Sequence, residues 1–174
     1  MLNYLEDDGL RRVNVAVLGP PGAGKSSVAA NLAKETDSTI VSDFEKVEKL
    51  SEKRNGWVLD GFPRNRAEAL RLQERGLLID YVFVLYGPRE LMQERQNGKK
   101  IDPETGIVYH PVFNWTADTE IVGRMVDVEI SDFDTNYDEY QKNREIVIDA
   151  HGKVSVKIFL GIGENFRNLD GPSH

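Results

Sequence analysis

Residues 19–26 read Gly-Pro-Pro-Gly-Ala-Gly-Lys-Ser, and this stretch decides the expected fold. It follows Arg12–Leu18 (RVNVAVL), an apolar run that would fill both faces of a buried strand. It precedes residues 25–35 (KSSVAANLAKE), whose apolar positions recur with helical spacing. The sequence therefore predicts a central strand, a glycine-rich loop and a helix in direct succession.

The loop matches G-x-x-x-x-G-K-[ST], a pattern that cradles phosphate groups when it joins a strand to a helix. Its glycines let backbone N–H groups converge on phosphate oxygens, and the helix N-terminus adds positive potential. Lys25 would reach the terminal phosphates, while the Ser26 hydroxyl would ligate Mg²⁺. A chance glycine turn is the alternative. The predicted binding residues for a nucleoside triphosphate are Gly22, Ala23, Gly24, Lys25, Ser26 and Ser27.

The composition is that of one globular domain, because 40% of the 174 residues are hydrophobic and 29% are charged. The 22 basic residues are outnumbered by 29 acidic ones, so a broad electrostatic contact with nucleic acid or anionic lipid is not expected. The absence of cysteine excludes disulfides, a thiol nucleophile and a thiolate zinc site. No apolar run reaches membrane-spanning length, and residues 1–9 are acidic where a targeting signal would be basic. We therefore expect a cytoplasmic protein without a membrane partner.

Four further apolar runs with strand character follow along the chain: 39–41, 57–59, 81–85 and 154–160. Stretches with helical spacing separate most of them, and this order predicts crossover connections between parallel strands. The expected fold class is therefore α/β, with a five-stranded parallel sheet between two layers of helices. In such sheets ligands collect at the carboxyl ends of the strands, where the glycine loop, Asp43 and Asp60 fall.

Two further segments resemble one protein family. Residues 56–64 (GWVLDGFPR) resemble the G-x-x-L-D-G-F-P-R signature of adenylate kinases, and residues 100–110 (KIDPETGIVYH) resemble the start of their lid domain. Together with the glycine loop, the resemblance covers most of residues 12–115. It implies a three-layer P-loop fold and a phosphotransferase that uses Mg²⁺ and moves the γ-phosphate of ATP to a nucleoside monophosphate, AMP being the first choice.

The resemblance also implies roles for individual residues around the loop. Asp60 would hold Mg²⁺ and its bound water together with Ser26, and Arg64 would bind the phosphate of the acceptor nucleotide as a planar fork. Arg95 stands where the family stacks an arginine on the adenine of ATP. The alternatives are an aspartate that caps the next turn and an arginine that is simply solvated.

Four cations are expected to neutralise the transferring phosphoryl group: Lys25, Arg64, Lys99 and Arg124. Lys99 occupies a position where the family has a lid-side arginine. It therefore supplies positive charge but not the two simultaneous hydrogen bonds that a planar guanidinium makes to a phosphate. A second family arginine is missing, because the R-L-x-x-Y element begins here with Asn136-Tyr137. Six acidic residues and no basic one lie between Met125 and Gln141, a pattern typical of a solvated acidic face.

The acceptor side of the sequence is shorter than the resemblance requires. The family inserts a helical nucleoside-monophosphate domain after the second strand, and only residues 44–55 are available here. Asp43 and Lys46 stand where the family's acceptor helix starts, and Lys46 takes the place of a phosphate-binding arginine. Lys46 is equally typical of the solvated face of a helix. Glu68 stands where the family's glutamine contacts adenine; a carboxylate only accepts hydrogen bonds, so it would favour guanine unless it is an exposed helical residue. The predicted substrate-binding residues are Asp43, Lys46, Arg64 and Glu68.

We expect a single P-loop kinase-like domain over residues 1–174. Its parts would be a core at 10–95 and 116–174, a lid at 96–115 and a vestigial nucleoside-monophosphate-binding segment at 42–55. Residues 99–115 lack helical spacing and predict a small irregular or hairpin excursion. Asp102 and Thr105 correspond to polar turn positions of the family's lid.

Two other functions stay open on the sequence alone. The short acceptor segment and the missing arginine favour a weakly active or inactive adenylate-kinase-like module, which binds ATP and serves assembly or regulation with a protein partner. A P-loop kinase for another small metabolite would also suit the reduced acceptor segment. A regulatory GTPase is not expected, because no N-K-x-D motif occurs. Phosphoryl transfer from ATP to AMP, GMP, CMP and UMP would discriminate among these functions.

Overall fold

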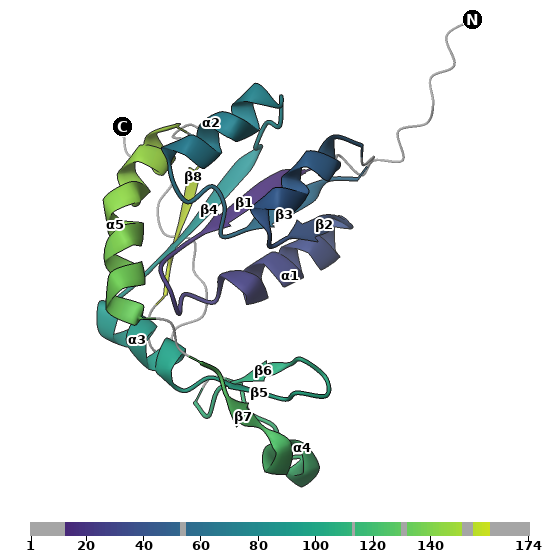
Figure 1. Cartoon of the computed structure of the whole chain (residues 1–174), viewed down its shortest axis with the longest axis vertical. Helices are drawn as coiled ribbons and strands as arrows, with labels where there is room; N and C mark the ends of the chain where they lie inside the picture. The colour runs from purple at the N-terminus through teal and green to yellow at the C-terminus, as the bar shows by residue number, and fades with distance from the viewer. Residues whose placement is uncertain (1–12, 53–54, 113, 130–131, 151–154, 161–174) are drawn as a thin grey trace, which may run out of the picture. The chain divides into compact units, whose positions relative to one another are not determined.

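The computed structural model describes residues 13–52, 55–112, 114–129, 132–150 and 155–160 (Figure 1). Its elements are β1 Asn14–Leu18, α1 Lys25–Thr36, β2 Thr39–Val41, η1 Phe44–Glu52, β3 Trp57–Asp60, α2 Arg66–Glu74, β4 Tyr81–Tyr86, α3 Arg89–Asn97, β5 Lys100–Ile101, β6 Val108–Tyr109, α4 Thr119–Arg124, β7 Val126–Asp127, α5 Phe133–Ala150 and β8 Ser155–Phe159. η1 is a 3₁₀-helix, and the others labelled α are α-helices. Each of the five strands predicted from the sequence is present within two residues of its predicted ends.

Strands β2, β3, β1, β4 and β8 form one five-stranded parallel sheet in that order, which confirms the predicted α/β fold class. β1 lies between β3 and β4, with Val17 opposite Asp60 on one side and Phe83 on the other. β1 and β2 follow each other in the chain but are not adjacent, because β3 pairs with both. The carboxyl ends of β1 and β3 therefore lie side by side, at the edge of the sheet where ligands bind in such folds.

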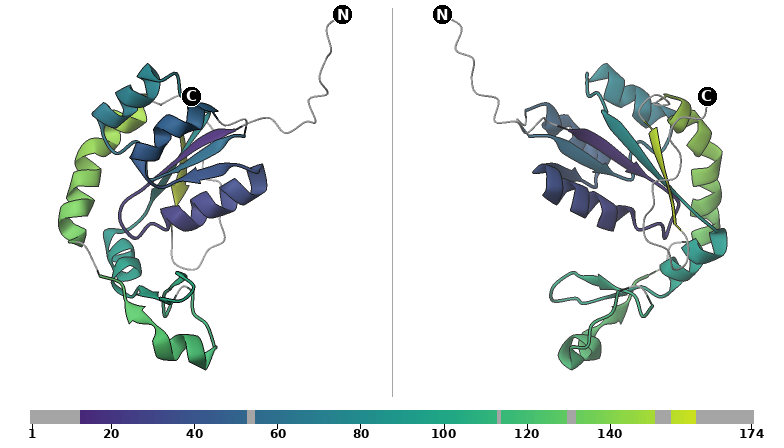
Figure 2. Two further views of the ribbon diagram at one scale, coloured as in Figure 1. Left: turned by 45° about the vertical axis from the view of Figure 1, so that its right-hand side comes forward. Right: turned by 180° about the vertical axis from the view of Figure 1, so that it is seen from behind.

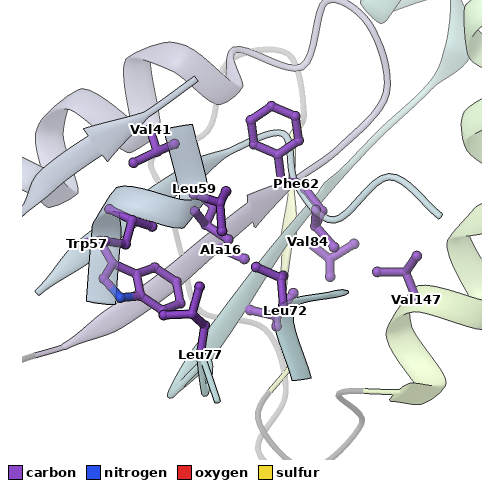
Figure 3. Close-up of a cluster of buried hydrophobic side chains, with 13 residues drawn as sticks. Ala16, Val41, Trp57, Leu59, Phe62, Leu72, Leu77, Val84 and Val147 are labelled. Carbon is purple, nitrogen blue, oxygen red and sulfur yellow. The ribbon is translucent and has the colours of Figure 1, made fainter. Parts of the chain in front are cut away.

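Side chains of β1 alternate between the two faces of the sheet. Ala16 and Leu18 belong to the main hydrophobic cluster, which η1, α2 and α5 complete with Val47, Leu72 and Val147 (Figure 3). The other face is covered by α1, which contacts β1, β2 and β3. Helices thus lie on both faces of these strands, as Figure 2 shows from two further directions.

The described chain divides into two compact units. The first contains the described residues of 1–18, 25–84 and 143–157, and the second contains those of 19–24, 85–142 and 158–174. The first unit holds α1, η1 and α2 with the strands that they cover, and the second holds α3, α4 and the short strands β5, β6 and β7. Among the helices described here, none is long and apolar enough to span a bilayer.

The segment predicted as an irregular or hairpin excursion forms part of a small antiparallel sheet, in the order β6-β5-β7. Ile101 of β5 lies opposite Val108 of β6 and Val126 of β7. The β5–β6 hairpin falls within residues 99–115, but β7 lies beyond them. The sequence pattern does not predict β7, because a two-residue strand carries no periodic signal of its own.

Leu72 and Leu70 of α2 provide a matched test of the main hydrophobic cluster. Leu72 is 1% exposed and packs in the cluster, whereas Leu70 is 44% exposed. Leu72→Ala is expected to lower the free energy of unfolding by about 2–5 kcal/mol, because it leaves a cavity, and Leu70→Ala by less than about 1 kcal/mol. Urea unfolding followed by circular dichroism measures both values. Equal losses from the two variants would contradict this placement of α2.

Candidate functional site

The glycine-rich loop, residues 19–24, connects the end of β1 directly to the first residue of α1. Gly22 and Gly24 have φ values of +79° and +82°, in a backbone region that residues with side chains rarely adopt. A Cβ on Gly22 would also collide with the backbone carbonyl of Met92 in α3. The loop's conformation therefore requires glycine at both positions, as expected of a loop that presents its backbone to a ligand.

The first turn of α1 continues the loop and contains no acidic residue, so its positive end is not neutralised from within the helix. Ala23 is 2% exposed, and its N–H donates to the Pro20 carbonyl at 3.2 Å. Ser26 and Ser27 are exposed at the start of the helix. The predicted triphosphate-binding residues thus form a closed turn followed by two accessible hydroxyl groups.

Ser26 and Asp60 bring a hydroxyl and a carboxylate together at the carboxyl edge of the sheet. Ser26 Oγ donates a hydrogen bond to Asp60 Oδ2 at 2.7 Å. Asp60 is the half-buried last residue of β3. Both groups offer hard oxygen ligands, which suit Mg²⁺, and two protein ligands leave the other positions of an octahedral ion to phosphates and water. The residues present therefore fit the predicted metal.

The side chain of Lys25 passes beside the backbone that follows β3. A Cβ built on Gly61 would lie 3.5 Å from Lys25 Cε, which is van der Waals contact. The Gly61 N–H donates to the Val17 carbonyl of β1 at 2.9 Å and ties this turn to the neighbouring strand. The structure thus brings Lys25, Ser26 and Asp60 together at the ends of β1 and β3.

Arg64 is exposed after β3, and its guanidinium contacts both an aromatic ring and a carboxylate. Its Cζ is 4.6 Å from the centre of the Phe62 ring. Its Nε is 3.7 Å from Glu68 Oε1, and its backbone N–H donates to Glu68 Oε2 at 2.6 Å. Asn65 caps α2 by accepting the Glu68 N–H at 3.0 Å. Two of the predicted substrate-binding residues, Arg64 and Glu68, are therefore in contact with each other.

Asp43 and Lys46 are exposed at the start of η1. Asp43 Oδ1 accepts the Glu45 N–H at 3.1 Å, and the Asp43 carbonyl accepts the Lys46 N–H at 3.0 Å. Asp43 thus caps the helix that it precedes. The described part of the segment between β2 and β3 forms this one short helix at residues 44–52.

Arg95 and Lys99 place two half-buried cations close together near the end of α3. Lys99 Nζ donates to Gln96 Oε1 at 2.9 Å. Burial lowers the pKa of Lys99, and the positive charge of Arg95 lowers that pKa further. Burial also lowers the pKa of Arg95. A negatively charged group beside this pair would stabilise both charged side chains.

Arg124, at the end of α4, binds the turn between β5 and β6. Its Nε and Nη2 donate to the two carboxylate oxygens of Asp102 at 2.7 and 2.8 Å, and its Nη1 lies 2.6 Å from Glu104 Oε2. Asp102 is 0% exposed and also accepts the Thr105 hydroxyl at 2.8 Å. The hydrogen bonds from Arg124 hold the pKa of Asp102 well below its usual range and raise the pKa of Arg124. Arg124 therefore cross-links this turn to α4.

The sequence is similar to those of several curated adenylate kinases. It is 32% identical to adenylate kinase 8 of Homo sapiens, over 88% of this chain and 40% of that protein. It is 28% identical to the adenylate kinase of Natronomonas pharaonis, over 79% of this chain and 83% of that protein. It is 29% identical to the chloroplastic adenylate kinase of Zea mays, over 66% of this chain and 53% of that protein. The chain belongs to the adenylate kinase family. No protein-family model matches it.

The chain spans less than half the length of the relatives named adenylate kinase 8. It spans 40% of the length of the human protein and 38% of the length of the Rattus norvegicus protein. The alignment with the human protein extends over 191 residues, more than the 174 residues of this chain. The matched region of that relative therefore contains residues that have no counterpart here.

The acidic tract of this adenylate kinase family member is exposed, as its sequence pattern predicts, and two of its carboxylates also bind an arginine. Arg89 of α3 donates to Asp134 at 2.6 Å and to Asp138 at 3.3 Å, and its guanidinium lies 4.7 Å from the centre of the Tyr137 ring. Asp132 caps α5, and its pKa is lowered by the hydrogen bonds that it accepts from the first turn of that helix. The tract therefore joins α3 to α5 within the second unit.

Phe62 and Glu104 contact predicted site residues but are not singled out by the sequence pattern. Phe62 supplies the surface on which Arg64 lies, and Glu104 supplies a second carboxylate to Arg124. A signal for Phe62 exists, because it lies two residues before Arg64 within the family signature. Glu104 lies within residues 100–110, which resemble the family's lid, but that resemblance does not indicate its partner, which is twenty residues further along the chain.

Proposed function

We propose that this adenylate kinase family member transfers the γ-phosphate of ATP to a nucleoside monophosphate, with AMP as the first candidate acceptor. The observation that carries the proposal is the meeting of Lys25, Ser26 and Asp60 where the glycine-rich loop enters α1. Phosphoryl transfer depends on positioning and on charge neutralisation rather than on a covalent intermediate, and these groups can supply both. The relatives named adenylate kinase support the same reaction type.

ATP is proposed to bind with its phosphates at residues 22–27. The backbone N–H groups of the loop would contact the phosphate oxygens, and Lys25 would contact the terminal phosphates. Ser26 and Asp60 are the proposed holders of Mg²⁺, either directly or through bound water. Mg²⁺ supplies positive charge that neutralises the phosphate oxygens during transfer.

Arg64 is the proposed contact for the acceptor phosphate, because its exposed guanidinium lies after the strand that ends in Asp60. A guanidinium matches two phosphate oxygens at once, which a single ammonium group cannot do. Asp43 and Lys46 stay predicted substrate contacts on the acceptor side, at the start of η1.

The lid is proposed to comprise residues 96–115 together with β7, which completes the small sheet. Arg95 at its base is proposed to stack on the adenine of ATP, and Lys99 to neutralise the transferring phosphoryl group. An anion near these residues would stabilise two cations that burial destabilises. Arg124 is proposed to contribute to catalysis through the turn that it holds.

A coupled assay of ADP formation tests the proposed function. The purified chain is given ATP and Mg²⁺ with AMP, GMP, CMP or UMP in turn, and ATP hydrolysis without an acceptor is subtracted. Transfer to AMP that is abolished by EDTA is the expected result. Absence of transfer to all four acceptors, in a preparation that binds Mg-ATP by calorimetry, would reject the proposed function.

A second candidate is a weakly active or inactive ATP-binding module that serves assembly or regulation. It is favoured by the described part of the segment between β2 and β3, which forms the short helix η1 where the family resemblance predicts a whole acceptor domain. Mg-ATP binding without phosphoryl transfer would select it, and a protein partner would then be sought. Transfer to a different small metabolite would instead indicate a metabolite kinase. A cytoplasmic location stays a prediction for all of these functions.

A further inference from the structure

Both carboxylate oxygens of Glu68 face Arg64 rather than pointing away from α2 into solvent. Oε2 accepts the Arg64 backbone N–H at 2.6 Å, and Oε1 lies 3.7 Å from the guanidinium Nε. The Glu68 side chain is 18% exposed, and that of Arg64 is 64% exposed. The more buried member of this pair is therefore the anion, and its charge is directed at the cation that is proposed to bind the acceptor phosphate.

The surroundings hold this pair in place from two sides. Asn65 caps α2 and accepts the backbone N–H of Glu68, which anchors the carboxylate at the first turn of the helix. The Arg64 guanidinium lies over Phe62, which is 2% exposed and makes an edge contact with Phe44 at 5.7 Å between ring centres. Arg64 is thus kept within reach of Glu68 by a fixed aromatic surface.

A phosphate monoester that approached Arg64 would meet Glu68 as a competitor. The phosphate carries about two negative charges at neutral pH, and the carboxylate carries one. If the phosphate shares Arg64 with Glu68, the two anions repel each other; if it displaces Glu68, the existing ion pair is lost. In either case Glu68 lowers the affinity of Arg64 for phosphate.

We propose that Glu68 sets the affinity of the acceptor phosphate by competing for Arg64, and that it does not contact the acceptor base. This inference rests on the proposed function, which places the acceptor phosphate at Arg64. A carboxylate whose two oxygens are directed at Arg64 is not presented to a base, so Glu68 is not expected to contact guanine. The consequence is a weakly held acceptor that exchanges rapidly.

Glu68→Gln tests the inference with little change in shape. The glutamine Oε1 still accepts the Arg64 N–H, but the side chain carries no charge. Isothermal titration calorimetry is expected to show AMP binding about three- to tenfold more tightly, while the affinity for adenosine, which lacks the phosphate, stays within about twofold. In the transfer assay, KM for AMP is expected to fall while kcat does not rise.

Two controls separate this effect from a general change in charge or stability. Glu74→Gln, at the other end of α2, makes the same change in net charge and is expected to leave AMP affinity within about twofold, since surface charges far from a ligand are screened. In a chain that already carries Arg64→Ala, Glu68→Gln is expected to leave AMP affinity within about twofold, because the guanidinium for which Glu68 and the phosphate compete is absent.

The outcomes distinguish this inference from the proposed function. If Arg64→Ala weakens AMP binding but Glu68→Gln leaves it unchanged, the role given to Glu68 is wrong and the acceptor placement stands. If Glu68→Gln improves AMP and adenosine binding equally, Glu68 acts on the nucleoside and the inference is also wrong. If Arg64→Ala has no effect on AMP binding, the acceptor is not at Arg64 and both proposals fail.

Discussion

Replacement of Lys25 by alanine is expected to slow phosphoryl transfer from ATP by about 10²–10³-fold, a loss typical of removing one preorganised charge from a transition state. Lys25 begins α1 directly after the glycine-rich loop, and its side chain passes beside Gly61 at the end of β3. In loops of this sequence pattern, the lysine ammonium group contacts the terminal phosphates of the nucleotide. Charge develops on these phosphates during transfer. The coupled assay with ATP and AMP measures the change in kcat.

Lys34→Ala provides the matched control for Lys25→Ala. Lys34 lies in the last turn of the same helix, so its removal changes the net charge and α1 in the same way without touching the loop. Lys34→Ala is expected to keep turnover within about twofold of the unmodified chain, as for most surface substitutions. Calorimetry with Mg-ATP adds a second readout, in which only Lys25→Ala weakens binding. Unchanged turnover and unchanged Mg-ATP affinity in Lys25→Ala would contradict the proposed site.

Arg124→Met is expected to open the small sheet locally while the parallel sheet stays folded. The substitution leaves the carboxylate of Asp102, which is 0% exposed, without the two hydrogen bonds from Arg124. Asp102 keeps its hydrogen bonds from Thr105 and the Glu104 N–H but loses its ion-pair partner. A buried charge without its ion-pair partner is strongly destabilising, so amide hydrogen exchange over residues 100–109 is expected to accelerate by about 10²-fold. Exchange in β1 and β3 is expected to stay unchanged, because these strands belong to the other unit.

An ion pair in the same small sheet serves as the control for Arg124. Lys100 Nζ lies 2.6 Å from Asp127 Oδ1, but the two side chains are 36% and 85% exposed. Lys100→Met removes this pair, and exchange over the small sheet is expected to change by less than about threefold, because exposed pairs contribute little. Equal acceleration by the two substitutions would contradict the structural role given to Arg124. Phosphoryl transfer measured on both variants then shows how far catalysis depends on that role.

The ion pair between Arg124 and Asp102 predicts how the small sheet of β5, β6 and β7 responds to acid. The pKa of Asp102 lies below its ordinary value of 3.8, so the ionised carboxylate stabilises the folded sheet above about pH 4. That stabilisation is lost as the pH falls from about 4 toward the lower pKa of the folded state. Arg124→Met removes the largest cause of the lowered pKa of Asp102, while the hydrogen bonds from Thr105 and from the Glu104 N–H remain. The pKa of Asp102 is therefore expected to rise relative to the unmodified chain, and the sheet to open at a higher pH. Amide chemical shifts of Ile101 and Tyr109 followed against pH measure both transitions.

The acceptor side shows where prediction from sequence reached its limit. The signature at residues 56–64 predicts a strand that ends in Asp60 and an arginine after it, and the structure has both. The signature does not indicate that Glu68 is directed at Arg64, because a helical glutamate can point along its own helix or away from it. Which of these occurs depends on the Asn65 cap, which is a local hydrogen bond, and on Phe62, whose position comes from packing in the main hydrophobic cluster.

The sequence by itself determined the parallel sheet and the glycine-rich loop between β1 and α1. These features depend on local properties: apolar runs form buried strands, helical spacing buries one face of α1, and only glycine readily adopts the φ values at Gly22 and Gly24. The tertiary structure alone decided that β7 joins the small sheet, that Arg124 is committed to Asp102 and that Arg89 binds the acidic tract. The reason is that long charged side chains and two-residue strands carry little local preference, so distant elements must meet before their partners are set.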